Sequence, residues 1–133
     1  MILIIGGIYQ GKTTFAKKEF NLLDSQIISG EFVCGNNLEN IKCIDNLELL
    51  ARKCLDENID VFELIDKIIN DNKDMVFVCA EVGCGIVPMD KRDRLYRDMV
   101  GKLSSKIADK SEKVIRLFAS IPTVLKDTNP RKE

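Results

Sequence analysis

Histidine is absent from this chain of 133 residues. Its absence excludes a Ser-His-Asp triad, imidazole metal ligands, a phosphohistidine intermediate and acid–base catalysis by an imidazole ring. Any chemistry must therefore use carboxylates, lysine, arginine, hydroxyls, thiols, backbone amides or a bound ion.

An excess of charge, a long apolar run and a paired cysteine motif are also missing. Lysine and arginine total 20 against 21 aspartate and glutamate residues, and this balance gives no polyanion-binding surface, so we expect no nucleic acid partner. The apolar runs are too short to cross a bilayer, and the opening run lacks the basic residues of a signal peptide. The five cysteines have no metal-binding spacing. We therefore expect a cytoplasmic protein with reduced thiols and no membrane partner.

The apolar pattern predicts alternating strands and helices. Strands are expected over residues 2–5, 26–29 (or on to 33), 41–44, 75–80, 114–119 and 123–126, and helices over 12–22, 47–55, 61–69 and 90–109. The continuous apolar runs at 2–5 and 75–80 are typical of strands buried on both faces of a parallel sheet. We therefore expect one α/β domain over residues 1–127, with a mostly parallel sheet flanked by helices and a late antiparallel strand, and a disordered tail at 128–133.

The segment between the first strand and the first helix has the spacing of a phosphate-binding loop. It matches G-x-x-x-x-G-K-[ST] through Gly6, Gly7, Ile8, Tyr9, Gln10, Gly11, Lys12 and Thr13, and Thr14 follows. The two glycines at 6 and 11 let the backbone wrap a phosphate, and the helix that begins at Lys12 points the positive end of its dipole at the same anion. The Lys12 ammonium would span the β- and γ-phosphates, and the Thr13 hydroxyl would bind Mg²⁺. Residues 6–14 are therefore predicted to bind ATP or GTP.

Two carboxylates follow predicted strands and are candidates for the chemistry. Asp45 closes the strand at 41–44, where it would hold Mg²⁺ through water, or it would only cap the helix that follows. Glu81 closes the strand at 75–80, where it would act as base toward a substrate hydroxyl or orient water or metal, or it would be a solvated loop carboxylate. Spacing alone leaves both pairs of alternatives open.

Two further blocks carry a resemblance to a known family. The first reads Glu81, Val82, Gly83, Cys84, Gly85, Ile86, Val87 and Pro88, and the second reads Arg94, Leu95, Tyr96, Arg97, Asp98, Met99, Val100 and Gly101. With the phosphate loop, they resemble the bifunctional adenosylcobinamide kinase/adenosylcobinamide-phosphate guanylyltransferases of cobalamin biosynthesis, over residues 1–20 and 75–126 and more loosely over 41–55. The resemblance implies a RecA-like P-loop NTPase fold, a metal-side position for Asp45 and assembly into a homo-oligomer.

Candidate substrate residues lie at and after the end of the strand at 75–80, namely Glu81, Val82 and Gly83. For the helix that follows, the resemblance favours Arg97 over Arg94 as the arginine that reaches back to an anionic substrate or to the nucleotide. The alternative for both arginines is a solvated, salt-bridged helix face.

The chain also departs from the family pattern. The family's guanylyl transfer uses a histidine on an insert after the first helix, and this chain has no histidine and a shorter segment between residues 20 and 41. The family tends to have Ala-Arg-Ser inside the phosphate loop, where Ile8, Tyr9 and Gln10 stand here, so a bidentate phosphate donor is lost. Covalent guanylylation by the family's route is therefore not expected.

Three functions follow from these observations. The first is a kinase that transfers the γ-phosphoryl of ATP or GTP to the hydroxyl of a corrinoid side chain, with Lys12, Asp45 and Glu81 as catalytic residues and Mg²⁺ as cofactor. The second is a nucleotide-binding or regulatory homologue that has lost catalysis, and the third is a P-loop NTPase with another substrate. The intact Lys12–Thr13 pair and the two carboxylates favour the first, and the missing histidine and altered loop favour the second.

Overall fold

A computed structural model describes residues 1–7, 10–81 and 90–128. The strands are β1 (Ile2–Gly6), β2 (Ile27–Ser29), β3 (Cys43–Asp45), β4 (Val76–Ala80), β5 (Lys113–Phe118) and β6 (Ile121–Asp127). The α-helices are α1 (Lys12–Glu19), α2 (Leu47–Asp56), α3 (Val61–Asp71) and α4 (Lys91–Lys110), and two short 3₁₀ helices, η1 (Asp24–Gln26) and η2 (Gly30–Phe32), flank β2.

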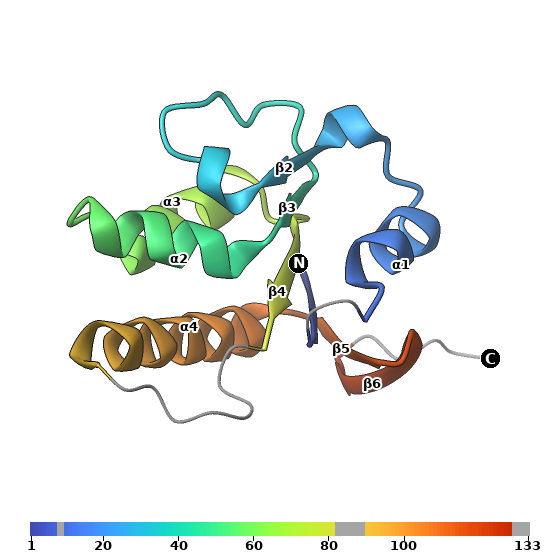
Figure 1. Ribbon diagram of the computed structural model, residues 1–133. Helices are drawn as coiled ribbons and strands as arrows, with labels where there is room; N and C mark the ends of the chain where they lie inside the picture. The colour runs from blue at the N-terminus through green and yellow to red at the C-terminus, as the bar shows by residue number, and fades with distance from the viewer. Residues whose placement is uncertain (8–9, 82–89, 129–133) are drawn as a thin grey trace.

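The six strands form one sheet in the order β2-β3-β4-β1-β5-β6. All neighbouring pairs are parallel except β5 and β6, which form an antiparallel hairpin. Helix α1 lies on one side of the central strands, and α2, α3 and α4 lie on the other side (Figure 1). This arrangement confirms the predicted α/β class, with a mostly parallel sheet and a late antiparallel strand.

The sheet separates two apolar layers because side chains alternate between its faces along each strand. On the face toward α2, α3 and α4, Leu3, Ile44 and Phe77 are fully buried in the larger cluster. On the face toward α1, Ile4 and Val78 are fully buried in a smaller cluster. The two faces define the α4 face and the α1 face used below.

Some predicted boundaries are wrong, and local packing explains them. The strand at 26–29 does not continue to 33, because the chain turns at Gly30 to pack against α2: a Cβ atom there would lie 2.3 Å from the carbonyl oxygen of Asn46. Helix α1 ends at Glu19 instead of residue 22, and Asn21 soon after has φ 55°. In the helix predicted at 90–109, Leu95, Met99, Leu103 and Ile107 follow one another at four-residue spacing, which predicts one apolar stripe, but Leu95 is 52% exposed.

The turn between the last two strands also differs from the prediction. It was expected at residues 120–122, but Ala119 and Ser120 form it, with φ of 50° and 63°. Two residues of positive φ make the type I′ geometry, whose twist matches that of the two strands. Ile121 therefore begins β6 directly opposite Phe118.

Residues 129–133 of the expected tail lie outside the described residues. Among the helices that the structure describes, none combines the length and apolar character needed to span a membrane.

Three cysteines are buried in the two layers, and the four described cysteines form no disulfide. Burial raises the pKa of the Cys43 thiol to about 12, and the nearby Asp45 carboxylate adds to the effect. Burial likewise raises the pKa of Cys79 to about 11 and, together with Cys34, that of Cys54 to about 12. These thiols are held in their neutral form.

We expect the raised pKa values of the buried thiols to make the protein less stable at alkaline pH. Above pH 9 the unfolded chain loses its thiol protons while the folded chain keeps them, so the free energy of unfolding falls as pH rises toward the folded pKa values. Cys43 and Cys79 together should lower it by about 2 kcal/mol between pH 9 and pH 10. Urea unfolding at the two pH values measures the difference, and the double variant C43A/C79A should show a shallower dependence. An equal dependence in both proteins would contradict the assignment.

Candidate functional site

The described part of the phosphate loop lies at the carboxyl end of β1, the central parallel strand. Gly6 ends β1, and Gly11 precedes α1 with φ 81°. A Cβ atom at Gly6 would lie 2.7 Å from the carbonyl oxygen of Leu117, so β5 approaches too closely for any other residue. Gly11 needs glycine for a different reason, because its positive φ strains other residues. Ile8 and Tyr9 lie outside the described residues.

Helix α1 starts without a side-chain cap or an acidic residue in its first turn. The first amide groups of a helix have no partner within the helix, and they carry the positive end of its dipole. The Lys12 ammonium donates a hydrogen bond of 2.7 Å to the carbonyl oxygen of Gly7, so its charge lies across the loop. Amides and ammonium together suit a phosphate chain. Thr14, next along the helix, is exposed.

Thr13 and Asp45 meet although 32 residues separate them in the sequence. The Thr13 hydroxyl donates a hydrogen bond of 2.7 Å to Asp45 Oδ2. The other oxygen, Oδ1, accepts from the amide of Asn46 at 2.8 Å. Asp45 does not cap α2, since the residue in the cap position is Asn46. β3 is not an immediate neighbour of β1, because β4 lies between them.

Asn46 and Ser29 hold the end of β3 and were not predicted as part of the site. Asn46 has φ 51°, and its side-chain amide donates a hydrogen bond of 2.8 Å to Ser29 Oγ at the end of β2. The positive φ turns the chain sharply into α2 and leaves the Asp45 carboxylate beside Thr13. An asparagine directly after a short strand is a weak signal that the sequence did offer.

Glu81 is held by a two-point ion pair with Arg116 of β5. The Arg116 Nε lies 3.0 Å from Glu81 Oε1, and its Nη2 donates to Oε2 at 3.1 Å. The Glu81 amide also donates to the carbonyl oxygen of Gly6 at 2.9 Å. The pair therefore bridges β4 and β5 across the end of β1, next to the start of the phosphate loop. Arg116 was not predicted, because a single arginine in a strand carries no motif.

Asp45 and Glu81 lie on opposite faces of the sheet. Cys43 packs in the α1-face cluster, so Asp45, two residues on, points to the same face. Cys79 packs in the α4-face cluster, so Glu81 points to the α4 face. The register pairs Ile44 with Phe77, so Glu81 also lies three residues, or about 10 Å, farther along the strand direction than Asp45. The two carboxylates cannot share one metal ion.

A third carboxylate, that of Glu48 in α2, supports the end of β4. Beyond Phe77 the register gives β4 no partner on β3, and Glu48 Oε1 accepts the amide of Ala80 at 3.0 Å. Tyr96 of α4 donates to the carbonyl oxygen of Glu48 at 3.1 Å, and the Arg52 guanidinium lies 3.9 Å from the Tyr96 ring centroid. Burial raises the pKa of Tyr96 to about 12, so its hydroxyl stays a donor. These contacts tie α2 and α4 to the strand that carries Glu81.

The arginines of α4 differ in their contacts and exposure. Arg92 and Asp93 form ion pairs with Asp56 and Arg52 of α2, as expected for a salt-bridged helix face. Arg94 is exposed and Arg97 half-buried. Val82 and Gly83, the other predicted substrate residues, lie outside the described residues, so their approach to these arginines stays a prediction.

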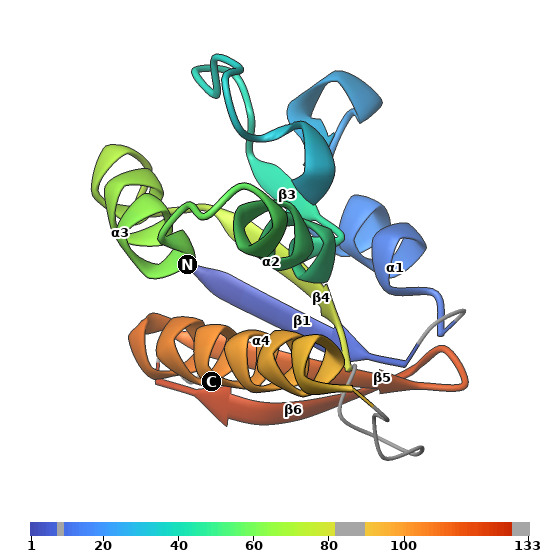
Figure 2. The same cartoon turned by 60° about the vertical axis from the view of Figure 1, so that its left-hand side comes forward.

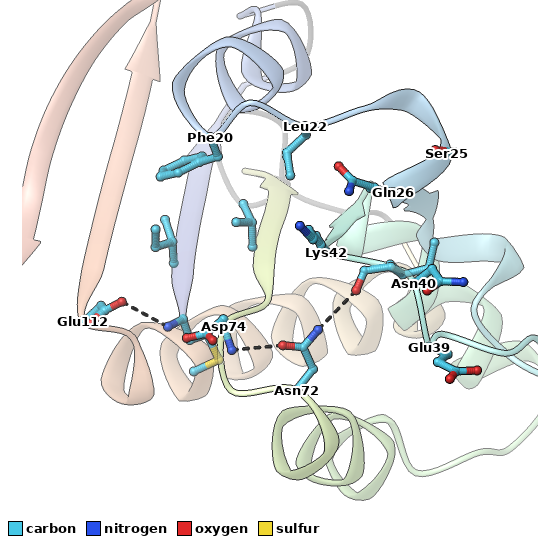
Figure 3. Close-up of a pocket in the computed structure, with 14 residues that line it drawn as sticks. Phe20, Leu22, Ser25, Gln26, Glu39, Asn40, Lys42, Asn72, Asp74 and Glu112 are labelled. Atoms are coloured by element: carbon cyan, nitrogen blue, oxygen red, sulfur yellow. Dashed lines mark hydrogen bonds and ion pairs between the residues drawn. The ribbon is translucent and has the colours of Figure 1, made fainter.

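A pocket of about 840 Å³ lies at the amino-terminal ends of the parallel strands, opposite to the phosphate loop (Figure 3). Phe20 and Leu22 lie over one side of it, and Asn72, which donates to the carbonyl oxygen of Ile41 at 3.2 Å, lies on another. Ligands of open parallel sheets gather at the carboxyl ends of the strands instead. The pocket is therefore separate from the candidate site.

The parallel sheet, the glycine turn after its central strand and the lysine and threonine that follow define a P-loop nucleotide-binding protein. Comparison with protein families then identifies the branch. Residues 33–125 match the model of the cobinamide kinase / cobinamide phosphate guanyltransferase family, and the chain belongs to this family. A search of curated proteins gave no match.

The match begins after the phosphate loop and includes Asp45, Glu81 and the arginines of α4. It confirms the predicted family and the P-loop fold class. The family's members are nucleotide-dependent enzymes of cobalamin biosynthesis. Membership of the family therefore supports a nucleotide-dependent enzyme here. The roles of individual residues remain predictions.

Proposed function

We propose that the protein is a magnesium-dependent kinase that transfers the γ-phosphoryl of ATP or GTP to a hydroxyl on a corrinoid side chain. The observation that carries the proposal is the hydrogen bond between Thr13 and Asp45, which joins the start of α1 to the end of β3 beside the Lys12 ammonium. This pair supplies two oxygen donors next to a positively charged loop. Family membership supports the choice of acceptor.

The oxygen donors fit Mg²⁺. This ion takes one or two protein ligands and completes its shell with water and phosphate oxygens. Within the described ranges no group of three or more histidine, cysteine or acidic side chains could hold a metal. When bound, Mg²⁺ would neutralise phosphate charge.

Lys12 and Glu81 would have different roles in phosphoryl transfer. Lys12 would move from the Gly7 carbonyl to the β- and γ-phosphates and stabilise the transferred group. Glu81 would accept the hydroxyl proton as the acceptor oxygen bonds to the γ-phosphorus, while the bond to the β-phosphate oxygen breaks and the nucleoside diphosphate leaves with its electron pair. Guanylyl transfer through a histidine has no residue to use here.

One observation favours a second candidate, a nucleotide-binding homologue without catalysis. Both oxygens of Glu81 are engaged by Arg116, so Glu81 would have to leave this ion pair before it could accept a proton from the substrate. Incubation with γ-labelled ATP, Mg²⁺ and adenosylcobinamide separates the two. Transfer of label to the corrinoid supports the kinase, and tight nucleotide binding without transfer supports the second candidate.

The role of Asp45 is tested by its dependence on Mg²⁺. We expect Mg²⁺ to strengthen ATP binding by the native protein by about tenfold and to have little effect on the Asp45→Asn variant, because the amide is a poorer ligand for a hard cation. Calorimetric titration with Mg²⁺ or with EDTA measures both. Asp24→Asn, which changes an 88% exposed carboxylate that pairs with Lys17, is the matched control. An unchanged response to Mg²⁺ in Asp45→Asn would exclude the metal role.

A further inference from the structure

Two large apolar side chains stand exposed beside the candidate site. Phe118, the last residue of β5, is 71% exposed, and Ile121, the first residue of β6, is 66% exposed. They form the cross-strand pair that closes the hairpin, so their side chains lie on the same face. Exposed apolar side chains that lie next to one another form a patch, and such patches mark binding surfaces more often than single scattered side chains do.

The pair lies on the same sheet face as Glu81. Val114 packs in the α4-face cluster, so Arg116 and Phe118, two and four residues on, point to that face. Lys126, opposite Val114, confirms the direction because its ammonium donates to the carbonyl oxygens of Ala108 and Asp109 at the end of α4. Phe118 is thus about 7 Å along β5 from the arginine that holds Glu81.

Helix α4 does not cover the pair. The hairpin runs alongside α4, and its turn extends past the first residues of that helix (Figure 2). The turn is fixed at the phosphate loop, since the Ala119 amide donates to Gln10 Oε1 and Ser120 Oγ lies 2.9 Å from where a Cβ atom of Gly11 would be. The pair is therefore held in place between the phosphate loop and the Glu81–Arg116 ion pair.

We infer that Phe118 and Ile121 form the docking surface for the apolar body of the acceptor substrate, with its reacting hydroxyl toward Glu81. This inference rests on the proposed function. The occupant is a molecule with a flat or extended apolar face that carries a hydroxyl on a side chain. The corrin ring of a cobinamide has such a face, and an amino-alcohol alone does not.

Two other occupants fit the observations less well. A nucleobase is disfavoured because the metal-side pair, Thr13 and Asp45, lies on the α1 face, whereas Phe118 points to the α4 face. A second copy that adds a strand to β6 is disfavoured by Pro122. Pro122 follows Ile121, which forms the hydrogen-bonded pair with Phe118 that closes the hairpin, so the backbone nitrogen of Pro122 faces away from β5. A strand added to β6 would need an N–H donor at this position, and proline has none.

Calorimetry on Phe118→Ala tests the inference. We expect its dissociation constant for adenosylcobinamide to rise about tenfold, while that for Mg·ATP stays within twofold of the native value. Phe118→Trp should keep native affinity, since it retains a large flat ring. Phe32→Ala is the matched control, because Phe32 is a 61% exposed phenylalanine on η2, beside the far edge of the sheet, and we expect no change in either constant.

A steady-state assay adds a second readout. With adenosylcobinamide as acceptor, Phe118→Ala should raise KM about tenfold at unchanged kcat, and with 1-amino-2-propanol, which lacks the apolar body, it should change neither constant. Equal weakening of Mg·ATP binding would assign the surface to the nucleobase and overturn the inference. A changed oligomeric state in sedimentation with unchanged corrinoid affinity would assign it to a second copy and also overturn it.

Failure of the proposed function gives a different result. If the native protein binds adenosylcobinamide in a Phe118-dependent way but transfers no phosphoryl group, the kinase proposal fails and the docking surface stands. If the native protein binds Mg·ATP but not adenosylcobinamide, the docking inference is overturned and nucleotide binding stands.

Discussion

Replacing Lys12 by alanine is expected to weaken the binding of Mg·ATP and Mg·GTP by about 100-fold. The ammonium donates to the Gly7 carbonyl at 2.7 Å, and in the proposed nucleotide complex it would donate to phosphate oxygens instead. A hydrogen bond to a charged group contributes about 1.5–3 kcal/mol, and the upper part of this range corresponds to the expected loss. Calorimetric titration of the native protein and the variant measures it.

Lys17→Ala provides the control for a general loss of positive charge on α1. Lys17 belongs to the same helix and pairs with the exposed Asp24 carboxylate at 2.8 Å, remote from the loop in the helix's last turn. We expect its nucleotide affinity to remain within about twofold of the native value, because exposed ion pairs contribute little. If Lys12→Ala bound ATP as tightly as Lys17→Ala, the loop would not be the nucleotide site.

Replacing Glu81 by glutamine is expected to lower kcat for phosphoryl transfer by about 10²–10⁴-fold. A positioned general base contributes a factor of this size, and glutamine keeps the shape of the side chain but cannot accept the proton. The dissociation constant for Mg·ATP should not change, because Glu81 lies on the α4 face, away from the Thr13–Asp45 pair. Single-turnover transfer from γ-labelled ATP to adenosylcobinamide measures the rate.

Glu57→Gln is the control for this substitution. Glu57 follows the end of α2 and pairs with Lys53 four residues earlier, so its loss should leave the rate unchanged. A drop of less than threefold in Glu81→Gln would leave Glu81 with a structural role only, as the partner of Arg116. A large rise in the dissociation constant for ATP with unchanged kcat would instead place Glu81 at the nucleotide.

The site is divided between the two faces of the sheet, so variants on the two faces are expected to change different steps. Lys12, Thr13 and Asp45 belong to the loop and the α1 face, and their variants should change nucleotide or metal binding. Glu81 and Phe118 belong to the α4 face, and their variants should change transfer or acceptor binding. A kinase needs both a donor and an acceptor side, and the phosphate loop at the end of β1 lies between them.

Much of the fold could be predicted from local pattern. The apolar runs at 2–5 and 75–80 became β1 and β4, which are paired at the centre of the sheet. The spacing of apolar residues at 47–55 and 61–69 became α2 and α3. The exposure of Leu95 was missed because the first turns of α4 pack against α2 through the neighbouring Tyr96, whose hydroxyl donates to the carbonyl oxygen of Glu48, and this leaves Leu95 outside the buried face.

The sequence by itself determined the strand–glycine turn–helix unit at residues 2–19 and the two acidic residues that follow strands. These depend on interactions between near neighbours in the chain, namely backbone freedom at glycine and the periodicity of apolar residues. Only the tertiary structure decided that Asp45 meets Thr13, that Arg116 holds Glu81 and that the two carboxylates face opposite sides of the sheet. Strand order and register place these residues, and both arise from packing between segments 30 or more residues apart, which no local pattern encodes.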